Sequence, residues 1–330
     1  MEKRHKGINY AKYGYIFCIP FVLAFLVFML YPLINTSIMG FTDASGISAL
    51  RGEFEVLDDP FENFTTLLFD NQLFRTSIAN TFRIWMVNFI PQIILSLTLT
   101  AWFTNNRNKL KGQGLFKILF YMPNIITAGS IAVLFGALFA FPVGPVQHLR
   151  SIFGQTEVYN FLSSQAASQN IVSFIQFWMW YGYTMLILIA GVLGLNPEMY
   201  ESSEIDGANA VQQFFFITLP NLKTILLFVV VTSIVGGITM FDIPMLFNDG
   251  GPVNATTTLS VFIFRQISPG GMMRFNVGAA ASLLVFILVA VLSVGAFYLL
   301  RDKDAAKQRK DEKALIRSLK AAKKEGQQNG

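Results

Sequence analysis

The chain has 330 residues, of which 53% are hydrophobic and only 14% are charged, with a formal net charge of +5 at pH 7. Soluble domains carry about 25% charged residues, so this composition excludes an ordinary soluble fold. The charges gather in short stretches that separate six runs without any Asp, Glu, Lys, Arg or His. In chain order these runs are residues 13–34, 84–103, 118–141, 171–195, 225–241 and 278–300.

Each run is long enough for a transmembrane helix. A helix rises about 1.5 Å per residue, so roughly 17 to 25 apolar residues cross a hydrocarbon core of about 30 Å. The first run could instead be the core of a cleaved signal peptide, since Lys3, Arg4 and Lys6 precede it. It is longer than such a core and ends in Tyr31 and Pro32 rather than in a small-residue cleavage site. We therefore expect an all-α membrane protein with six transmembrane helices.

The distribution of Lys and Arg predicts the orientation. With six crossings both termini share one side, and that side holds 19 of the 25 Lys and Arg residues. Positively charged flanks resist translocation, so both termini are predicted to be cytoplasmic. The domain organisation expected from this is a cytoplasmic N-terminal tail over 1–12, a membrane domain over 13–300, and a charged cytoplasmic tail over 301–330.

The external segments are acidic between the first two runs and broken by Gly250, Gly251 and Pro252 after the fifth. They are either solvated connections or a docking surface for an outside partner. The tail 301–330 holds ten cations and five acids. It is either a solvated end or a basic helix that rests on anionic lipid.

The segment 196–221, between the fourth and fifth runs, breaks the charge pattern. It would be cytoplasmic, yet it carries four acids and no cation before Lys223. Asn196 suits a helix cap and Pro197 a first helical position, while Gly207 permits a turn and Pro220 ends a helix. The segment is therefore predicted to form a helix-turn-helix with an apolar side.

This segment resembles the Glu-Ala-Ala loop of ATP-binding-cassette (ABC) importer permeases, which couples the permease to its ATPase. Glu201, Gly207 and Pro220 stand at the matching places, and Asp206 precedes the glycine. Ser202 and Ser203 replace the two alanines. The alternative is an ordinary amphipathic hairpin that lies at the membrane surface.

The resemblance covers residues 13–300 and points to the carbohydrate subgroup of binding-protein-dependent importers, typified by maltose, lactose and glycerol-phosphate importers. The segments that carry it are Glu62-Asn63-Phe64, Asn80-Thr81, Phe120-Tyr121-Met122-Pro123-Asn124, Phe241-Asp242, Gly250-Gly251-Pro252 and Thr256-Thr257-Thr258-Leu259. It implies a type I ABC importer permease fold in a bacterial inner membrane.

The resemblance and the absence of a phosphate-binding loop together predict the partners of the chain. The chain has no G-x-x-x-x-G-K-[ST] phosphate loop, so ATP hydrolysis is expected in a separate polypeptide. The resemblance implies two cytoplasmic ATP-binding subunits that use ATP and magnesium, a second homologous permease forming a heterodimer, and an extracellular solute-binding protein. We expect no metal, no cofactor of the chain's own and no nucleic-acid partner.

The sequence disfavours two other function classes. An ion-coupled secondary transporter usually carries titratable groups inside the membrane, and the six runs contain none. A membrane enzyme is also disfavoured, because His5 and His148 lie without a carboxylate or cysteine cluster. The chain is therefore predicted not to be an enzyme.

The substrate path is expected to use neutral hydrogen-bonding groups and flat apolar faces, which suit a sugar. The candidate residues are Trp85, Asn88, Gln92, Asn124, Gln176, Trp180, Tyr181 and Tyr183. The alternative is that aromatic residues gather at the membrane interfaces and amides join helices. The hypothesis is an uncharged oligosaccharide, and the alternative substrate is a glycerol-phosphate ester.

Overall fold

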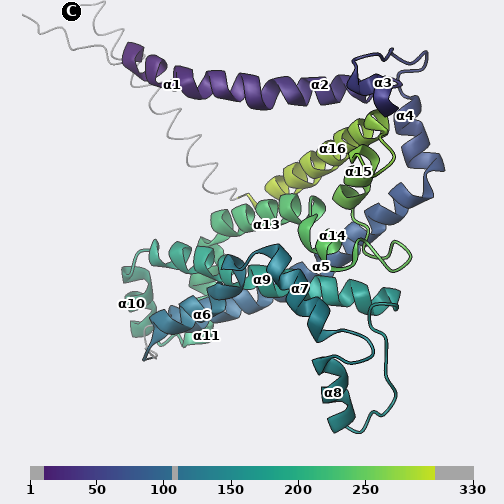
Figure 1. The fold of residues 1–330 in the computed structure, drawn as a ribbon. Coiled ribbons are helices and arrows are strands. Elements are labelled where there is room, and N and C mark those ends of the chain that lie inside the picture. The colour runs from purple at the N-terminus through teal and green to yellow at the C-terminus, as the bar shows by residue number, and fades with distance from the viewer. Residues whose placement is uncertain (1–10, 106–110, 302–330) are drawn as a thin grey trace, which may run out of the picture. The chain divides into compact units, whose positions relative to one another are not determined.

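The computed structural model describes residues 11–105 and 111–301. The charged tail predicted over 302–330 and most of the N-terminal tail lie outside these residues, so the cytoplasmic placement of the termini stays a prediction. Within the described part the chain is helical, and an isolated antiparallel bridge joins Thr42 to Val56. The helices fall into two compact units, which are described separately (Figure 1).

The first unit contains the described residues up to Ser77 together with Leu259–Ile287. Its elements are α1 (Ala11–Phe25), the π-helical turn η1 (Leu26–Leu30), α2 (Tyr31–Met39), α3 (Gly46–Leu50), α4 (Glu62–Thr65), the π-helical turn η2 (Thr66–Asp70), the start of α5 (Gln72–Phe103), α15 (Leu259–Ile267) and the first half of α16 (Phe275–Leu300).

Asparagine side chains bind the first unit together. Asn63 is buried and donates to the backbone oxygens of Gly40 and Thr42 at 3.0 and 2.9 Å. Asn276, at the start of α16, donates to the Asn63 side chain at 3.2 Å. A buried amide must be hydrogen-bonded, so these bonds fix the end of α2 and the start of α16 around Asn63.

The first apolar run is one continuous helical stretch, Tyr13–Met39, formed by α1, η1 and α2. None of its most apolar stretch is buried within the chain. A helix that is apolar all round and uncovered needs lipid or another protein chain around it.

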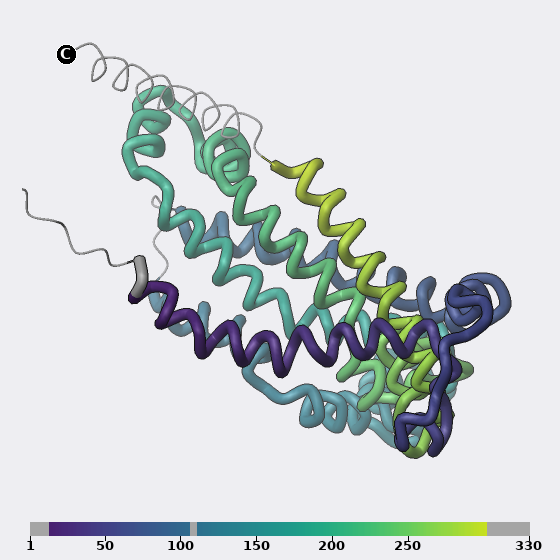
Figure 2. The backbone as a smooth tube through the Cα atoms, turned by 90° about the horizontal axis from the view of Figure 1, so that it is seen from above, coloured from purple at the N-terminus to yellow at the C-terminus, as the bar shows by residue number. Residues whose placement is uncertain are grey.

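The second unit contains Ile78–Thr258 and the described residues from Leu288 onward. Besides most of α5 its elements are α6 (Gln113–Ile125), α7 (Ala128–Leu138), α8 (Pro145–Ile152), α9 (Gln165–Leu193), α10 (Glu198–Ile205), α11 (Ala210–Gln213), the π-helical turn η3 (Phe214–Thr218), α12 (Leu219–Asn221), α13 (Lys223–Ile238) and α14 (Asp242–Asn248). Helix α9 packs against α6, α13 and α14, and Figure 2 shows α9 and α13 running alongside each other.

Neutral polar side chains join α5 to α9 inside the second unit. Gln92 donates to the Thr184 hydroxyl at 2.8 Å, and Ser96 donates to the Tyr181 backbone oxygen at 2.7 Å. Both donors are buried among apolar residues. Such bonds hold helices together where water is absent, because an unpaired polar group there is costly.

Five of the described helical stretches are long and apolar enough to cross a membrane, and a bent helix pair gives six if it counts as one span. The five are Tyr13–Met39, Gln72–Phe103, Gln165–Leu193, Lys223–Asn248 and Phe275–Leu300. Five of the six predicted runs therefore lie in helices of sufficient length.

The run 118–141, predicted to form one transmembrane helix, forms two helices with a bend between them. The chain forms α6 and α7, which meet at an angle of 91°. Ile126 and Thr127 are extended between them, with ψ of 136° and 144°, and the Thr127 side chain accepts from the Ser130 amide to begin α7. Thr is a favoured N-cap residue, but neither residue is charged, so the break does not interrupt the uncharged run in the sequence.

Candidate functional site

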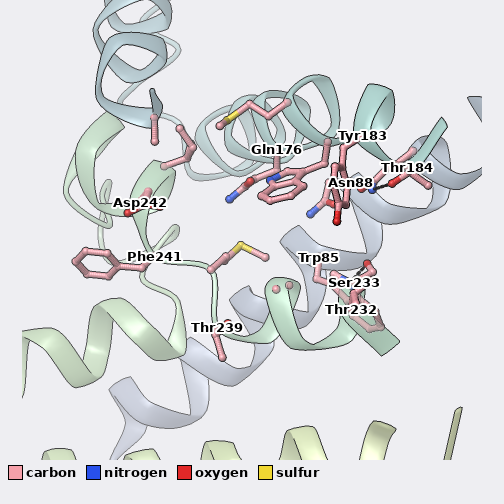
Figure 3. A pocket seen from close by; sticks show the side chains of 18 residues that line it. Trp85, Asn88, Gln176, Tyr183, Thr184, Thr232, Ser233, Thr239, Phe241 and Asp242 are labelled. Atoms are coloured by element: carbon pink, nitrogen blue, oxygen red, sulfur yellow. Dashed lines mark hydrogen bonds between the residues drawn. The ribbon is translucent and has the colours of Figure 1, made fainter. Parts of the chain in front are cut away.

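A cavity of about 260 Å³ lies among α5, α9, α13 and α14 in the second unit (Figure 3). Six of the eight candidate path residues line it: Trp85, Asn88, Gln92, Gln176, Trp180 and Tyr183. Three come from α5 and three from α9, at spacings of three, four or seven residues. Residues at those spacings share one face of a helix, so each helix presents a single neutral polar and aromatic face to the cavity.

The other two candidates lie elsewhere in the second unit. Tyr181 is buried, with its ring 5.6 Å from Phe177 and 6.2 Å from Phe120. It follows Trp180 directly, and one residue turns a helix by about 100°, which carries Tyr181 off the cavity face. Asn124 donates to the Met179 backbone oxygen at 3.2 Å and so joins α6 to α9.

Trp85 is held in place by α13. Its indole nitrogen donates to the Ser233 hydroxyl at 3.0 Å, and its ring stacks on Phe89 at 5.8 Å. Gly237 makes room for the indole, since a Cβ there would overlap the Trp85 ring. The small residue on α13 therefore lets the Trp85 indole take this position in the cavity wall.

Several lining residues were not predicted from the sequence to belong to the substrate path. They include Thr184 on α9, Thr232 and Ser233 on α13, and Met240, Phe241 and Asp242 beyond it. Thr184 lies eight residues after Gln176, so helical spacing could have found it. Asp242 ends the fifth uncharged run and was singled out only as a family motif. Figure 3 shows Phe241 and Asp242 across the cavity from Asn88 and Thr184.

The cavity wall is almost free of charge. Among its lining residues Asp242 is the one acidic residue, and there is no Lys, Arg or His. Trp180 and Tyr183 are partly exposed there and meet edge to face with ring centroids 5.7 Å apart. The arrangement offers hydroxyls, amides and aromatic faces, which bind uncharged polar molecules better than anions.

A second feature is the hairpin 196–221, in which the predicted helix-turn-helix geometry is confirmed. Helix α10 ends at Ile205 with Asp206 as its C-cap, and Gly207 adopts a left-handed conformation with φ of 81°. The amides of Gly207 and Ala208 donate to the oxygens of Glu204 and Ser203, which is the Schellman helix ending. Glycine avoids the steric cost of that conformation, which explains the residue at this position.

The second arm begins on a capping box. The Asn209 side chain accepts from the Gln212 amide, and the Gln212 side chain accepts from the Asn209 amide. The π-helical turn η3 and the short helix α12 follow. Reciprocal capping satisfies two amides that the first helical turn leaves unpaired, so the turn between the arms has a defined geometry.

The expectation that Pro220 ends the helix is wrong. Pro220 lies inside α12, and α13 begins at Lys223, so helical backbone continues almost without interruption. Proline costs little in the first turn of a helix, where its missing amide hydrogen would have no partner. The preceding π-helical turn places Pro220 at such a position.

The two serines that replace alanines have different surroundings. Ser203 is buried against the second arm, where its hydroxyl accepts from the Gln213 amide at 2.9 Å. Ser202 is exposed and bonds only to the Met199 oxygen in its own helix. Both Glu201 and Asp206 are exposed as well.

The hairpin also exposes large apolar side chains. Ile205, Phe215 and Phe216 are 87%, 55% and 77% exposed. Exposed apolar side chains gathered on one element are typical of a surface that another protein or a membrane covers.

Comparison with known proteins relates these features to a family. No protein-family model matches the chain. Over 303 residues it is 28% identical to the lactose transport system permease protein LacF of Rhizobium radiobacter, with 91% of this chain and 97% of the relative covered. It is also 28% identical over 281 residues to the arabinooligosaccharides transport system permease protein AraP of Bacillus subtilis (strain 168), with 85% of each covered. The chain is a homologue of sugar ABC transport permeases.

The permease fold is shared with solved structures. One is a bacterial ABC transporter involved in the import of the acidic polysaccharide alginate, with a TM-score of 0.74, 22% identity and coverage of 90% of this chain and 97% of that one. The alginate transporter in complex with an alginate pentasaccharide-bound periplasmic protein matches with a TM-score of 0.74, 23% identity and coverage of 91% and 98%. The resemblance found in the sequence is thereby confirmed, and the chain is a multi-pass membrane protein.

Proposed function

We propose that this chain is the membrane-spanning permease subunit of an ATP-driven importer that carries an uncharged sugar or oligosaccharide across a bacterial inner membrane. The observation that carries the proposal is the cavity of about 260 Å³, lined by amides, hydroxyls and aromatic rings. Sugars present hydroxyl groups on their edges and apolar C–H faces, which match such a lining. The sugar permeases to which the chain is homologous support the same substrate class.

The charge of the cavity favours a neutral substrate over a phosphate ester or an acidic sugar. An anion in a site of low dielectric constant needs a nearby cation, because an uncompensated charge there costs several kcal/mol. The lining residues provide no cation, and the Asp242 carboxylate would repel an anion. The acidic polysaccharide carried by the alginate transporter is therefore not the expected substrate.

The hairpin 196–221 is proposed to dock into a separate ATPase subunit. Its exposed residues include apolar Ile205, Phe215 and Phe216 and the carboxylates of Glu201 and Asp206. A partner groove with apolar walls and basic rims would cover both. On this proposal two ATPase subunits bind ATP and magnesium, and their closure moves the hairpin and with it α9 and α13, which flank it in the chain.

The remaining partners are proposed from the family. A second, homologous permease would cover the exposed apolar surface of Tyr13–Met39 or share it with lipid. An extracellular solute-binding protein would deliver the sugar, as the periplasmic protein bound to the alginate transporter suggests. Both termini would face the cytoplasm.

Uptake into proteoliposomes tests the function. The complex with its partner permease, ATPase and binding protein should accumulate a labelled neutral oligosaccharide only when ATP and magnesium are present on the ATPase side. Uptake that persists without ATP, or with this chain alone, would instead indicate an ion-coupled transporter.

Competition tests the substrate class. Unlabelled neutral oligosaccharides should suppress uptake, whereas a glycerol-phosphate ester and an alginate fragment should not. Preferential uptake of the phosphate ester would overturn the sugar assignment and leave the ATP-driven mechanism intact.

A further inference from the structure

Two buried side-chain amides bind one loop in the second unit. Asn80 on α5 donates through Nδ2 to the backbone oxygens of Asn254 and Thr257 at 2.8 and 3.1 Å. Gln169 on α9 donates through Nε2 to the Ala255 oxygen at 2.7 Å and to the Asn80 side chain at 2.9 Å. Each amide nitrogen therefore uses both of its hydrogens, and the pair joins two helices to residues 249–258, here called the gate loop.

The gate loop is also bonded within itself. The Thr256 hydroxyl donates to the Asn248 side chain at 2.7 Å, and the Asn248 amide donates to the Gly251 oxygen at 2.6 Å. The Thr257 hydroxyl donates to the Gly250 oxygen at 3.0 Å. Both threonines are fully buried, so the loop is a compact body, and the two amides bind it to α5 and α9.

The gate loop is connected to the wall of the cavity. The Thr258 hydroxyl donates to the backbone oxygen of Met240, and Met240 lines the cavity. Helix α14, which leads into the loop, packs against α7 and α9 through Ile243 and Phe247 in an apolar cluster. Movement of the loop would therefore shift one wall of the cavity.

The position of the amides places the loop at one end of the cavity. Asn80 lies eight residues before Asn88, and Gln169 lies seven residues before Gln176, so both amides lie on the cavity-facing sides of α5 and α9. Seven or eight residues correspond to about 10 to 12 Å along a helix. The first cavity-lining residues are Trp85 on α5 and Gln176 on α9, so the loop is bound about one and a half to two turns from the cavity, toward the N-terminal ends of both helices.

We propose that Asn80 and Gln169 are positioning residues that latch the gate loop over this end of the cavity and keep it shut until the transport cycle opens it. The inference rests on the proposed function, and on the predicted topology the latched end faces the outside. The latch brings Asn80 and Thr257, which lie far apart in the sequence, into contact.

Thiol labelling in the assembled complex tests the latch. The single cysteine is removed by Cys18→Ser, and Ala255→Cys then places one thiol at a position that is 5% exposed in the latched loop. The complex with its partner subunits is placed in lipid nanodiscs without nucleotide and treated with a water-soluble maleimide. Val253→Cys is the matched control, because Val253 lies in the same loop and is 81% exposed.

Isosteric substitutions then remove the donors. Asn80→Asp and Gln169→Glu keep the side-chain shape but set carboxylate oxygens against backbone oxygens, so labelling of the Ala255→Cys variant should become at least about tenfold faster through local opening. Labelling of the Val253→Cys variant should be unchanged. Asn170→Asp, an exposed neighbour of Gln169, should keep labelling of Ala255→Cys slow. Equal labelling of Ala255→Cys with and without the amides would overturn the latch.

A second measurement needs no change to the amides. In the complex with native Asn80 and Gln169, trapping the nucleotide-bound state should accelerate labelling of the Ala255→Cys variant, because the outer end must open to admit the sugar. No acceleration would contradict the role as a gate. Neither labelling experiment depends on sugar uptake. A wrong substrate assignment would therefore show in the uptake assay and would not change the labelling results.

Discussion

The Gln213 side chain donates to the Ser203 hydroxyl at 2.9 Å and joins the two arms of the hairpin 196–221. Both side chains are buried, and Ser203 itself donates to the Tyr200 backbone oxygen at 2.7 Å. Ser203→Ala removes the acceptor and leaves Gln213 only a long bond of 3.4 Å to the Tyr200 oxygen. We expect the free energy of unfolding to fall by about 1 kcal/mol, measured as a lower thermal midpoint of the purified complex.

Ser202→Ala is the control for that substitution. The Ser202 side chain is exposed and bonds only within α10, so the expected change is within about 0.5 kcal/mol. Equal effects of the two substitutions would show that the bond between Ser203 and Gln213 contributes nothing to the hairpin.

Gly207→Val is expected to abolish coupling without affecting membrane insertion. A β-branched residue enters the left-handed conformation only at a cost of about 1 kcal/mol or more, so the turn should change. No heavy atom lies within 4 Å of a Cβ at this position, so the effect is on the backbone alone. The measurement is ATPase co-purification together with binding-protein-stimulated ATP hydrolysis. Gly207→Asn should keep much more activity, because Asn tolerates this conformation.

Glu201→Lys tests the same docking surface by charge. The Glu201 side chain is exposed on α10, so reversing its charge should leave the fold intact and weaken ATPase binding where the partner offers hydrogen-bond donors. Lower ATPase co-purification in a folded variant is the expected result. Full stimulated hydrolysis and full uptake in both this variant and Gly207→Val would exclude the hairpin as the coupling element.

Alanine substitutions of two adjacent glycines on α13 should have very different effects on the KM for sugar uptake. Gly237→Ala places a Cβ into the Trp85 indole, whereas Gly236→Ala meets no heavy atom within 4 Å. The first substitution should displace Trp85 and break its bond to Ser233, and so raise the KM for sugar uptake. Gly236→Ala should leave KM unchanged. If both variants behave like the parent, Trp85 does not shape the substrate site.

Two tyrosines on α9 offer a matched pair for the substrate path. Tyr183 lines the cavity, whereas Tyr181 is buried on a different side of the helix. Tyr183→Phe should raise the KM for sugar uptake by about two- to tenfold, the expected effect of losing one hydrogen bond. Tyr181→Phe should leave KM unchanged. The opposite pattern would place the path on the other face of α9.

The sequence by itself determined the class of the protein and most of its helices. A chain in lipid must satisfy its backbone hydrogen bonds within helices or closed barrels, and long uncharged runs indicate helices. The turn of the hairpin was equally predictable, because Gly207 acts on residues next to it. The predicted start of the hairpin was wrong by one residue: α10 begins at Glu198 with Pro197 as its N-cap, and Asn196 accepts from the Glu198 amide. Side-chain chemistry also picked out Asn88, Gln92 and Gln176, which line the cavity.

Only the tertiary structure determined the features that arise from contacts between residues distant in the sequence. The break at Ile126 and Thr127 is invisible to composition, because both side chains suit an apolar helix. Helical spacing puts Tyr181 and Tyr183 on different sides of α9, and only the packing of α9 showed which side faces the cavity. The latch likewise joins Asn80, Gln169 and the gate loop across 86 and more positions of sequence, and a hydrogen bond between such positions exists only once the helices have packed.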